Sequence, residues 1–156
     1  MRLLLLISLA CTLPASAQAA HWLADHNSGC QIRNPRPLPD ESVSWSGGCN
    51  NGKASGLGIL RWYAEGKLFL TLTGVMEAGQ CRRNCTVSTQ SGSSYVGDLR
   101  DNRPHGSGTL RSADGSSYTG GWAGGKKHGP GRFTAKDGSS QQELWEQGTN
   151  VSAPPH

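Results

Sequence analysis

The sequence predicts an all-β repeat protein in which each repeat unit is a β-hairpin. Composition is the first observation behind this prediction. Of the 156 residues, 22 are glycine, while only 35% are hydrophobic and 6% are aromatic. After residue 20, Leu, Ile, Val and Phe together number 19, too few for the large close-packed core of a doubly wound or barrel enzyme. The second observation is a period of 23 residues, the signature of a repeat architecture.

The first element is a leader over residues 1–20. Met1 and Arg2 form a short positive region, an apolar run extends from Leu3 to Leu13, and small residues follow. This order is typical of a secretory signal peptide that is cleaved. The apolar run is about half as long as a membrane-spanning helix requires. We therefore expect an exported protein, secreted or periplasmic, with no transmembrane segment after cleavage.

Export changes the interpretation of the cysteines. Cys11 leaves with the leader, and four cysteines remain in an oxidising compartment, where disulfides form and persist. Three pairings are possible, and we prefer Cys30–Cys49 with Cys81–Cys85. A zinc site is the competing interpretation. It normally needs a second close pair of ligands, and Cys30 and Cys49 are 19 residues apart.

Residues 21–44 show no repeat and contain prolines at positions 35, 37 and 39. We expect this segment to be a Pro-rich N-terminal lead-in or cap, tied to the rest of the chain by Cys30–Cys49. Residues 150–156, at the other end, are expected to form a flexible tail.

Between these ends, residues 45–149 form the repeat array. Three kinds of position recur every 23 residues: a large side chain, a glycine two residues later, and a second large side chain. Their members are Leu72, Tyr95 and Tyr118; Gly74, Gly97 and Gly120; and Met76, Leu99, Trp122 and Trp145. The predicted units are 45–66, 68–92 (degenerate), 93–115, 116–138 and 139–149 (partial).

The unit 93–115 shows why each unit is expected to be a hairpin. Tyr95, Gly97 and Leu99 fall on one face of an alternating segment. Turn-forming residues follow over 100–105, and the chain returns through a second alternating segment. Glycine inside a strand weakens a sheet unless something packs closely over it. We expect Gly97 and Gly108 to leave space for an aromatic ring of a neighbouring repeat.

Two of these segments, Tyr95-x-Gly97-x-Leu99 and Tyr118-x-Gly120-x-Trp122, together with residues 125–131, resemble membrane occupation and recognition nexus (MORN) repeats. The resemblance implies an elongated, twisted single antiparallel sheet, built as a meander of hairpins. Unit 68–92 departs from the pattern, because Leu72 replaces the tyrosine and Cys85 replaces a glycine of the return strand. Residues 21–44 do not resemble the family.

Candidate binding residues come from the regular units. They are Tyr95, Tyr118, Trp122, Lys126, Lys127, His105 and His128. The two lysines lie at a turn, where they could meet anionic lipid head groups, and the aromatic rings could stack on sugars. The simpler interpretation is that the lysines are solvated turn residues and that the rings form the core.

Catalysis is disfavoured. His105 and His128 occupy equivalent turns, so they recur because the repeat recurs, whereas a catalytic site is normally singular and enclosed. We predict no catalytic residue, no cofactor, no metal and no nucleic-acid partner. The leading hypothesis is a non-enzymatic exported module for protein–protein interaction or scaffolding at the cell envelope, whose partner is another envelope or extracellular protein. The alternatives are binding of anionic lipid head groups or cell-wall glycan through basic turns and sheet-face aromatics, and a hydrolase that uses the turn histidines.

Overall fold

A computed structural model describes residues 21–34 and 37–152, so the predicted leader lies outside the described residues. Within these ranges the chain forms one fourteen-stranded sheet and no helix. The strands are β1 (His21–Ala24), β2 (Gln31–Asn34), β3 (Glu41–Trp45), β4 (Gly48–Asn50), β5 (Lys53–Ala64), β6 (Lys67–Glu77), β7 (Gln80–Cys81), β8 (Cys85–Thr89), β9 (Ser94–Arg100), β10 (Arg103–Arg111), β11 (Ser117–Ala123), β12 (Lys126–Thr134), β13 (Ser140–Glu146) and β14 (Thr149–Asn150). The predicted all-β class is confirmed.

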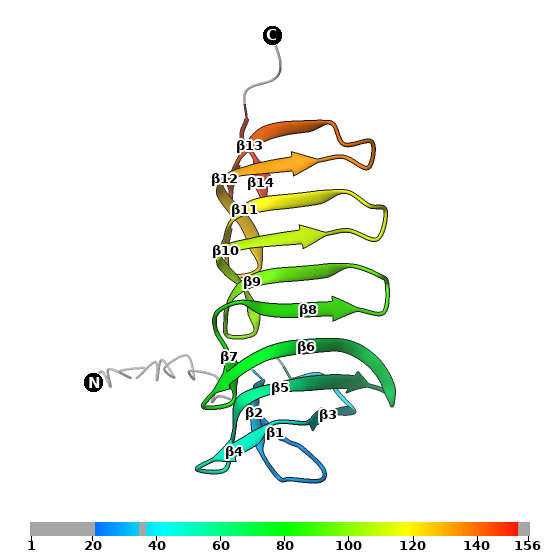
Figure 1. The fold of residues 1–156 in the computed structure, drawn as a ribbon, viewed down its shortest axis with the longest axis vertical. Coiled ribbons are helices and arrows are strands. Elements are labelled where there is room, and N and C mark those ends of the chain that lie inside the picture. The colour runs from blue at the N-terminus through cyan, green and yellow to red at the C-terminus, as the bar shows by residue number, and fades with distance from the viewer. Residues whose placement is uncertain (1–20, 35–36, 153–156) are drawn as a thin grey trace, which may run out of the picture.

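The hairpins follow one another along the long axis of the molecule, with the N-terminal strands at one end and the C-terminal strands at the other (Figure 1). From β5 onward each strand pairs antiparallel with the next, except that short β7 pairs only with β6, which also pairs with β8. The pairing of β2 with β5 is parallel. Because each hairpin contacts mainly its neighbours, stability is the sum of many local interfaces, as in other repeat proteins.

Two kinds of turn alternate along the array. At one end of the hairpins, Asp101-Asn102, Gly124-Gly125 and Gln147-Gly148 all have positive φ angles, as two-residue hairpin turns of type I′ require. At the other end, a carboxylate closes the turn. Asp114 accepts a hydrogen bond from the Ser116 backbone N–H at 2.8 Å, and Asp137 accepts one from Ser139 at 2.9 Å.

The long return strands are bent at regular intervals. The pairing of β9 with β10 shifts register between Pro104 and Gly108, and that of β11 with β12 shifts between Gly120 and Trp122. Gly106 and Gly129 have φ angles of 71° and 78° at these places, where bulges bend a strand and increase its twist. The ends of the strands consequently turn behind the main plane of the sheet (Figure 1).

The inner face of this bent sheet carries the core. Its central members include Leu72, Tyr95, Leu99, Tyr118 and Trp122, all of which are buried. The opposite face is here called the outer face. It carries a row of small and β-branched side chains that are direct cross-strand neighbours on β8 to β11, namely Thr86, Val96, Thr109 and Thr119.

Each tyrosine packs on the glycines of its own hairpin. A Cβ placed on Gly97 would lie 2.6 Å from the Tyr95 hydroxyl, and one on Gly108 would overlap the Tyr95 ring. The Tyr95 hydroxyl donates a hydrogen bond to the Asp98 carbonyl at 2.9 Å, which holds the ring over its own strand. The expectation that these glycines accommodate a ring from a neighbouring repeat is therefore wrong.

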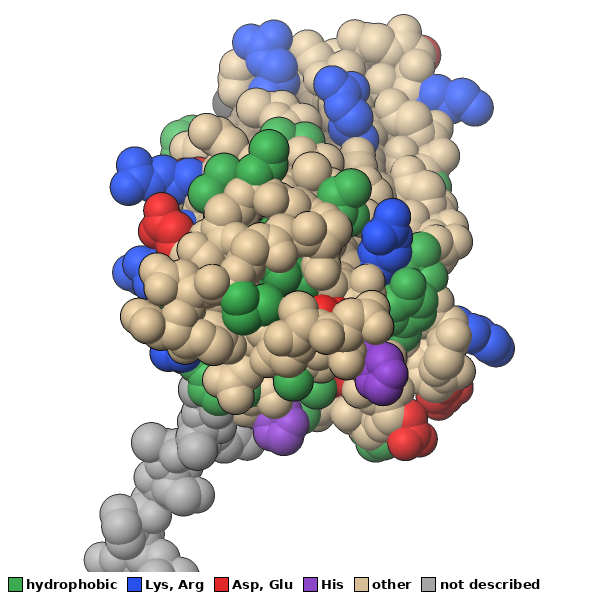
Figure 2. Space-filling model, turned by 60° about the horizontal axis from the view of Figure 1, so that its bottom comes forward, with side chains coloured by type: hydrophobic (Ala, Val, Ile, Leu, Met, Phe, Trp, Pro, Cys, Tyr) green, Lys and Arg blue, Asp and Glu red, His purple; other side chains and the backbone are tan. Residues whose placement is uncertain are grey.

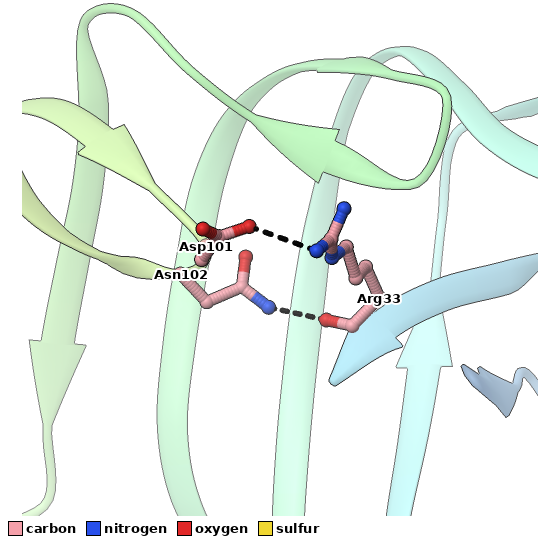
Figure 3. A network of polar contacts seen from close by, with 3 residues as sticks. All are labelled: Arg33, Asp101 and Asn102. Atoms are coloured by element: carbon pink, nitrogen blue, oxygen red, sulfur yellow. Dashed lines mark hydrogen bonds and ion pairs between the residues drawn. The ribbon is translucent and has the colours of Figure 1, made fainter. Parts of the chain in front are cut away.

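The N-terminal segment forms strands that are fastened to the array. Cys30 and Cys49 are at disulfide distance, as are Cys81 and Cys85. Arg33 forms an ion pair with Asp101, its Nη2 lying 3.2 Å from Oδ1, and Asn102 donates its side-chain amide to the Arg33 carbonyl (Figure 3). These contacts join β2 to the turn between β9 and β10, 68 residues further along the chain.

The end of the chain is also paired as far as the described residues extend. The Ser152 hydroxyl accepts a hydrogen bond from the Leu144 N–H at 2.8 Å, and the Val151 N–H donates to the Leu144 carbonyl. Of the predicted tail, residues 153–156 lie outside the described part of the chain.

Candidate functional site

The predicted aromatic residues form a column through the inner face. The Trp122 ring meets Tyr95 and Tyr118 edge to face, with centroids 5.5 and 5.4 Å away, and Tyr118 meets Trp145 in the same way at 6.1 Å. The Trp122 indole N–H donates to the Gly108 carbonyl at 3.1 Å. Edge-to-face geometry is the arrangement that aromatic pairs favour. This burial supports the interpretation of Tyr95, Tyr118 and Trp122 as core residues.

The column changes the acid–base behaviour of its tyrosines. Burial, with a further contribution from the Asp98 carboxylate, raises the pKa of Tyr95 to about 12. Burial and the nearby Glu143 also raise the pKa of Tyr118. Both phenols therefore remain neutral well above physiological pH and act as hydrogen-bond donors.

Lys127 covers the C-terminal end of the aromatic column. Its ammonium group lies 4.2 Å from the Trp145 ring centroid, 4.3 Å from that of Tyr118 and 5.9 Å from that of Phe133. Burial lowers the pKa of Lys127, although Glu143 opposes this effect. The ammonium group is thus engaged in cation–π contacts with its own chain.

Glu143 completes this end of the array. It occupies the position at which Gly97 and Gly120 stand in the two preceding units, yet only 8% of it is exposed. Its carboxylate accepts hydrogen bonds from the Trp145 indole at 2.9 Å and from the Gln141 amide at 3.0 Å. The carboxylate and Lys127 together cover the C-terminal end of the column.

The remaining predicted residues lie on the surface and do not converge. Lys126 is exposed, and exposed His128 accepts a 3.4 Å hydrogen bond from the Gln147 N–H. His105 lies far from both in the chain and lines a separate hollow. That hollow also contains Asp98 and Asp101, but no Ser, Thr or Cys is among the described residues that line it, so the hydrolase hypothesis gains no nucleophile there.

This basic hollow has a volume of about 470 Å³. Its charged members are Arg33, Arg82, Arg83, Asp98, Arg100 and Asp101, with His105 beside them. Arg33 lies on β2, and Arg82 and Arg83 lie in the link between β7 and β8. Asp98 and Arg100 lie on β9, Asp101 lies in the turn that follows, and His105 lies on β10. No spacing in the sequence relates the four arginines, because the topology alone brings them together, and they were therefore not predicted as a group.

The outer face presents aliphatic side chains to solvent. Leu57 is 73% exposed, Val75 52% and Val96 47%. Leu57 and Val75 are direct cross-strand partners on β5 and β6. Looking toward the N-terminal end of the array, Figure 2 shows hydrophobic side chains as separate patches among polar atoms, with Lys and Arg projecting around the outline.

Among the described residues, no group of three or more His, Cys, Asp or Glu side chains is arranged to hold a metal ion. No helix in the same ranges is long and apolar enough to cross a membrane.

The repeat spacing, hairpin geometry and stacked aromatic residues all agree with one family. The sequence model of the MORN repeat matches residues 45–64, 95–117 and 118–140. The chain contains three MORN repeats and is a MORN-repeat protein. MORN repeats are generally protein- or membrane-binding modules without catalytic activity. Among curated proteins, none matches the chain.

Proposed function

We propose that the chain is a non-enzymatic, exported interaction module that binds another protein of the cell envelope through the outer face of its sheet. The leader-like sequence of residues 1–20 supports export. The two cysteine pairs at disulfide distance are typical of an oxidising compartment outside the cytosol. The MORN repeats support binding in place of catalysis.

The observation that carries the proposal is the aliphatic part of the outer face. Leu57, Val75 and Val96 are large, exposed and uncharged. Thr73, on the same strand as Val75, pairs with Thr86 on β8, which in turn pairs with Val96 on β9. The centres of protein–protein interfaces are depleted in charge, and contiguous exposed apolar surface marks interaction sites. From Tyr95 to Trp122 the inner face is filled by its own buried side chains, whereas the outer face there is open to a partner.

A shallow hollow extends this surface toward the C-terminal units. It has a volume of about 590 Å³ and is lined by Val96, Thr109 and Thr119 together with Gly120 and Pro130. The glycines in its floor expose backbone, so a partner could approach the sheet closely there. Hydroxyl groups of Thr109 and Thr119, 2.9 Å apart, offer hydrogen bonds beside the aliphatic surface.

The alternative, binding of anionic lipid or glycan through basic turns and aromatic residues, has less support. Tyr95, Tyr118 and Trp122 are buried, and Lys127 is engaged with the rings beneath it. Lys126 alone projects freely from that turn, and a single cation is weaker than the polybasic clusters that bind anionic membranes.

Affinity capture from an envelope extract tests the proposal. The oxidised protein is compared with the variant Val75→Lys/Val96→Lys, which places two charges on the outer face. The matched control is Leu38→Lys/Phe69→Lys, whose positions are 57% and 52% exposed and line a different hollow. We expect the outer-face variant to lose a specific partner that the control retains. Equal retention by both variants, or no specific partner for the unmodified protein, contradicts the proposal.

A further inference from the structure

We propose that the basic hollow binds a phosphate or sulfate group of a ligand. This inference does not depend on the proposed protein-binding function, although the two surfaces adjoin, since Arg82 and Arg83 also line a hollow with Leu57 and Val75 of the outer face. It rests on the charge balance of the hollow, on how its arginines are held, and on a comparison between repeat units of the same chain.

The hollow carries an excess of positive charge. Four arginines face two aspartates, Asp98 and Asp101, which leaves a net charge of +2 with His105 neutral. Asp101 is engaged by Arg33 at 3.2 Å. In the described parts of the chain no other arginine is in an ion pair, so Arg82, Arg83 and Arg100 have charge available for a ligand.

The adjoining hairpin increases this excess. Arg100 and Arg103 stand directly opposite one another at the ends of β9 and β10. Like charges at directly opposed positions of a sheet are destabilising. Both residues line a small hollow next to the basic one, again with His105. An oxyanion bound here would relieve the repulsion, so its binding would stabilise the hairpin.

The backbone that carries the arginines between β7 and β8 is held in place before any ligand arrives. Arg82 and Arg83 lie within the short ring closed by Cys81–Cys85. The Arg82 carbonyl accepts a hydrogen bond from the Leu99 N–H at 2.8 Å, which fixes the ring against β9. A ligand site whose backbone is fixed in the free protein loses less entropy on binding than one that must first be ordered.

Comparison with the following repeat unit shows that the hairpin does not need these charges. Moving 23 residues along the chain from unit 93–115, Arg100 is replaced by Ala123, Asp98 by Gly121 and Asp101 by Gly124. The unit 116–138 nevertheless forms the same paired strands, β11 and β12. Asp101 is accounted for by its ion pair with Arg33, but packing of the hairpin does not explain why Arg100 and Asp98 are charged in the preceding unit.

The donor set suits a tetrahedral oxyanion. Guanidinium groups present paired N–H donors that match phosphate and sulfate oxygens, and such charge-assisted hydrogen bonds are stronger than neutral ones. The Arg33 Nε is shielded from solvent and has no hydrogen-bond partner among the described residues, so it retains a donor. A volume of about 470 Å³ also exceeds what one oxyanion occupies, which leaves room for the group that carries it.

Ligand-dependent stability and vesicle binding test the inference and separate soluble from membrane-borne sources. The first arm measures the unfolding midpoint of the oxidised protein with inorganic phosphate, with sulfate and with chloride at equal ionic strength. The second arm measures cosedimentation with phosphatidylcholine vesicles that contain or lack phosphatidic acid. We expect phosphate or sulfate to raise the midpoint above chloride, or phosphatidic acid to increase cosedimentation.

Arg82→Gln/Arg83→Gln and Arg100→Ala are the site variants. We expect both to fold, since Arg82, Arg83 and Arg100 are exposed and alanine stands at position 123, which is equivalent to position 100. Lys126→Gln/Arg132→Gln removes the same charge as the double site variant from other exposed positions. We expect the site variants to weaken binding about tenfold or more and the control to change it little. Equal weakening in the control, or no response in either arm, overturns the inference.

Discussion

Gly108→Ala should destabilise the protein strongly, although the same change normally stabilises a strand. Gly108 has a φ angle that alanine also adopts, and replacing glycine by alanine inside a strand is ordinarily favourable by about 0.5–1 kcal/mol. Here the new Cβ would overlap the Tyr95 ring. Overpacking costs about 1–3 kcal/mol, and loss of the hydrogen bond from the Tyr95 hydroxyl costs about 1 kcal/mol. The net expectation is a loss of about 2 kcal/mol.

The chain itself suggests how to rescue this variant. In unit 68–92 the tyrosine position holds Leu72 and the glycine position holds Cys85, so a Cβ is accommodated where the ring is absent. Tyr95→Leu/Gly108→Ala should therefore be more stable than the sum of the single changes predicts, by about 1–3 kcal/mol. Urea unfolding followed by tryptophan fluorescence measures all four proteins, with exposed Ser107→Ala as the control. The reasoning is refuted if Gly108→Ala leaves the free energy of unfolding unchanged, or if the effects of the two single changes simply add in the double variant.

Three further predictions concern the column and its fastenings. Lys127→Met should lower the free energy of unfolding by about 1 kcal/mol, because the cation–π contacts of Lys127 are lost. Lys126→Met should have little effect in the same urea titration. Equal effects of the two changes would contradict the cation–π contacts of Lys127. The pKa of Tyr95 is raised to about 12 in the folded protein, so this side chain ionises at a lower pH in the unfolded chain. The free energy of unfolding should therefore fall as the pH rises from about 10 to about 12. Tyr95→Phe should make this decline with pH less steep. An unchanged decline in the variant would contradict the raised pKa of Tyr95. Replacing both cysteines of Cys30–Cys49 by alanine should cost about 3 kcal/mol, and replacing those of Cys81–Cys85 about 2 kcal/mol, because the first pair closes the longer loop. The reverse order in urea unfolding would contradict this loop-entropy argument.

The array could be predicted because its information is local and repeated. Alternation around Gly97 and Gly120 identifies strands, and turn residues such as Asp114 and Gly115 identify their ends. A hairpin requires only neighbouring strands to pair. Where the pattern of one unit is ambiguous, the equivalent positions of the next unit resolve it. A period of 23 residues therefore predicts the strands better than any single segment does.

The surroundings of the basic hollow could not be predicted in the same way. Arg33 and Asp101 are 68 residues apart and belong to segments of different kind, so no period relates them. The packing of Tyr95 on Gly108 was predicted as a contact between repeats, because alternation gives the face of a side chain and not the bend of the strand beyond it. That bend depends on Gly106, whose positive φ angle is a property of the backbone.

Departures from the repeat can be sorted by whether packing accounts for them. Leu72 and Cys85 depart together, because the smaller side chain at one position makes room for a Cβ at the other. Glu143 departs where the array ends, and its buried carboxylate satisfies the last indole N–H. Arg82 and Arg83 depart on exposed positions where no such compensation exists. A repeat protein thus supplies its own internal reference, and a charged departure that stabilises nothing in the fold is the place to look for a ligand.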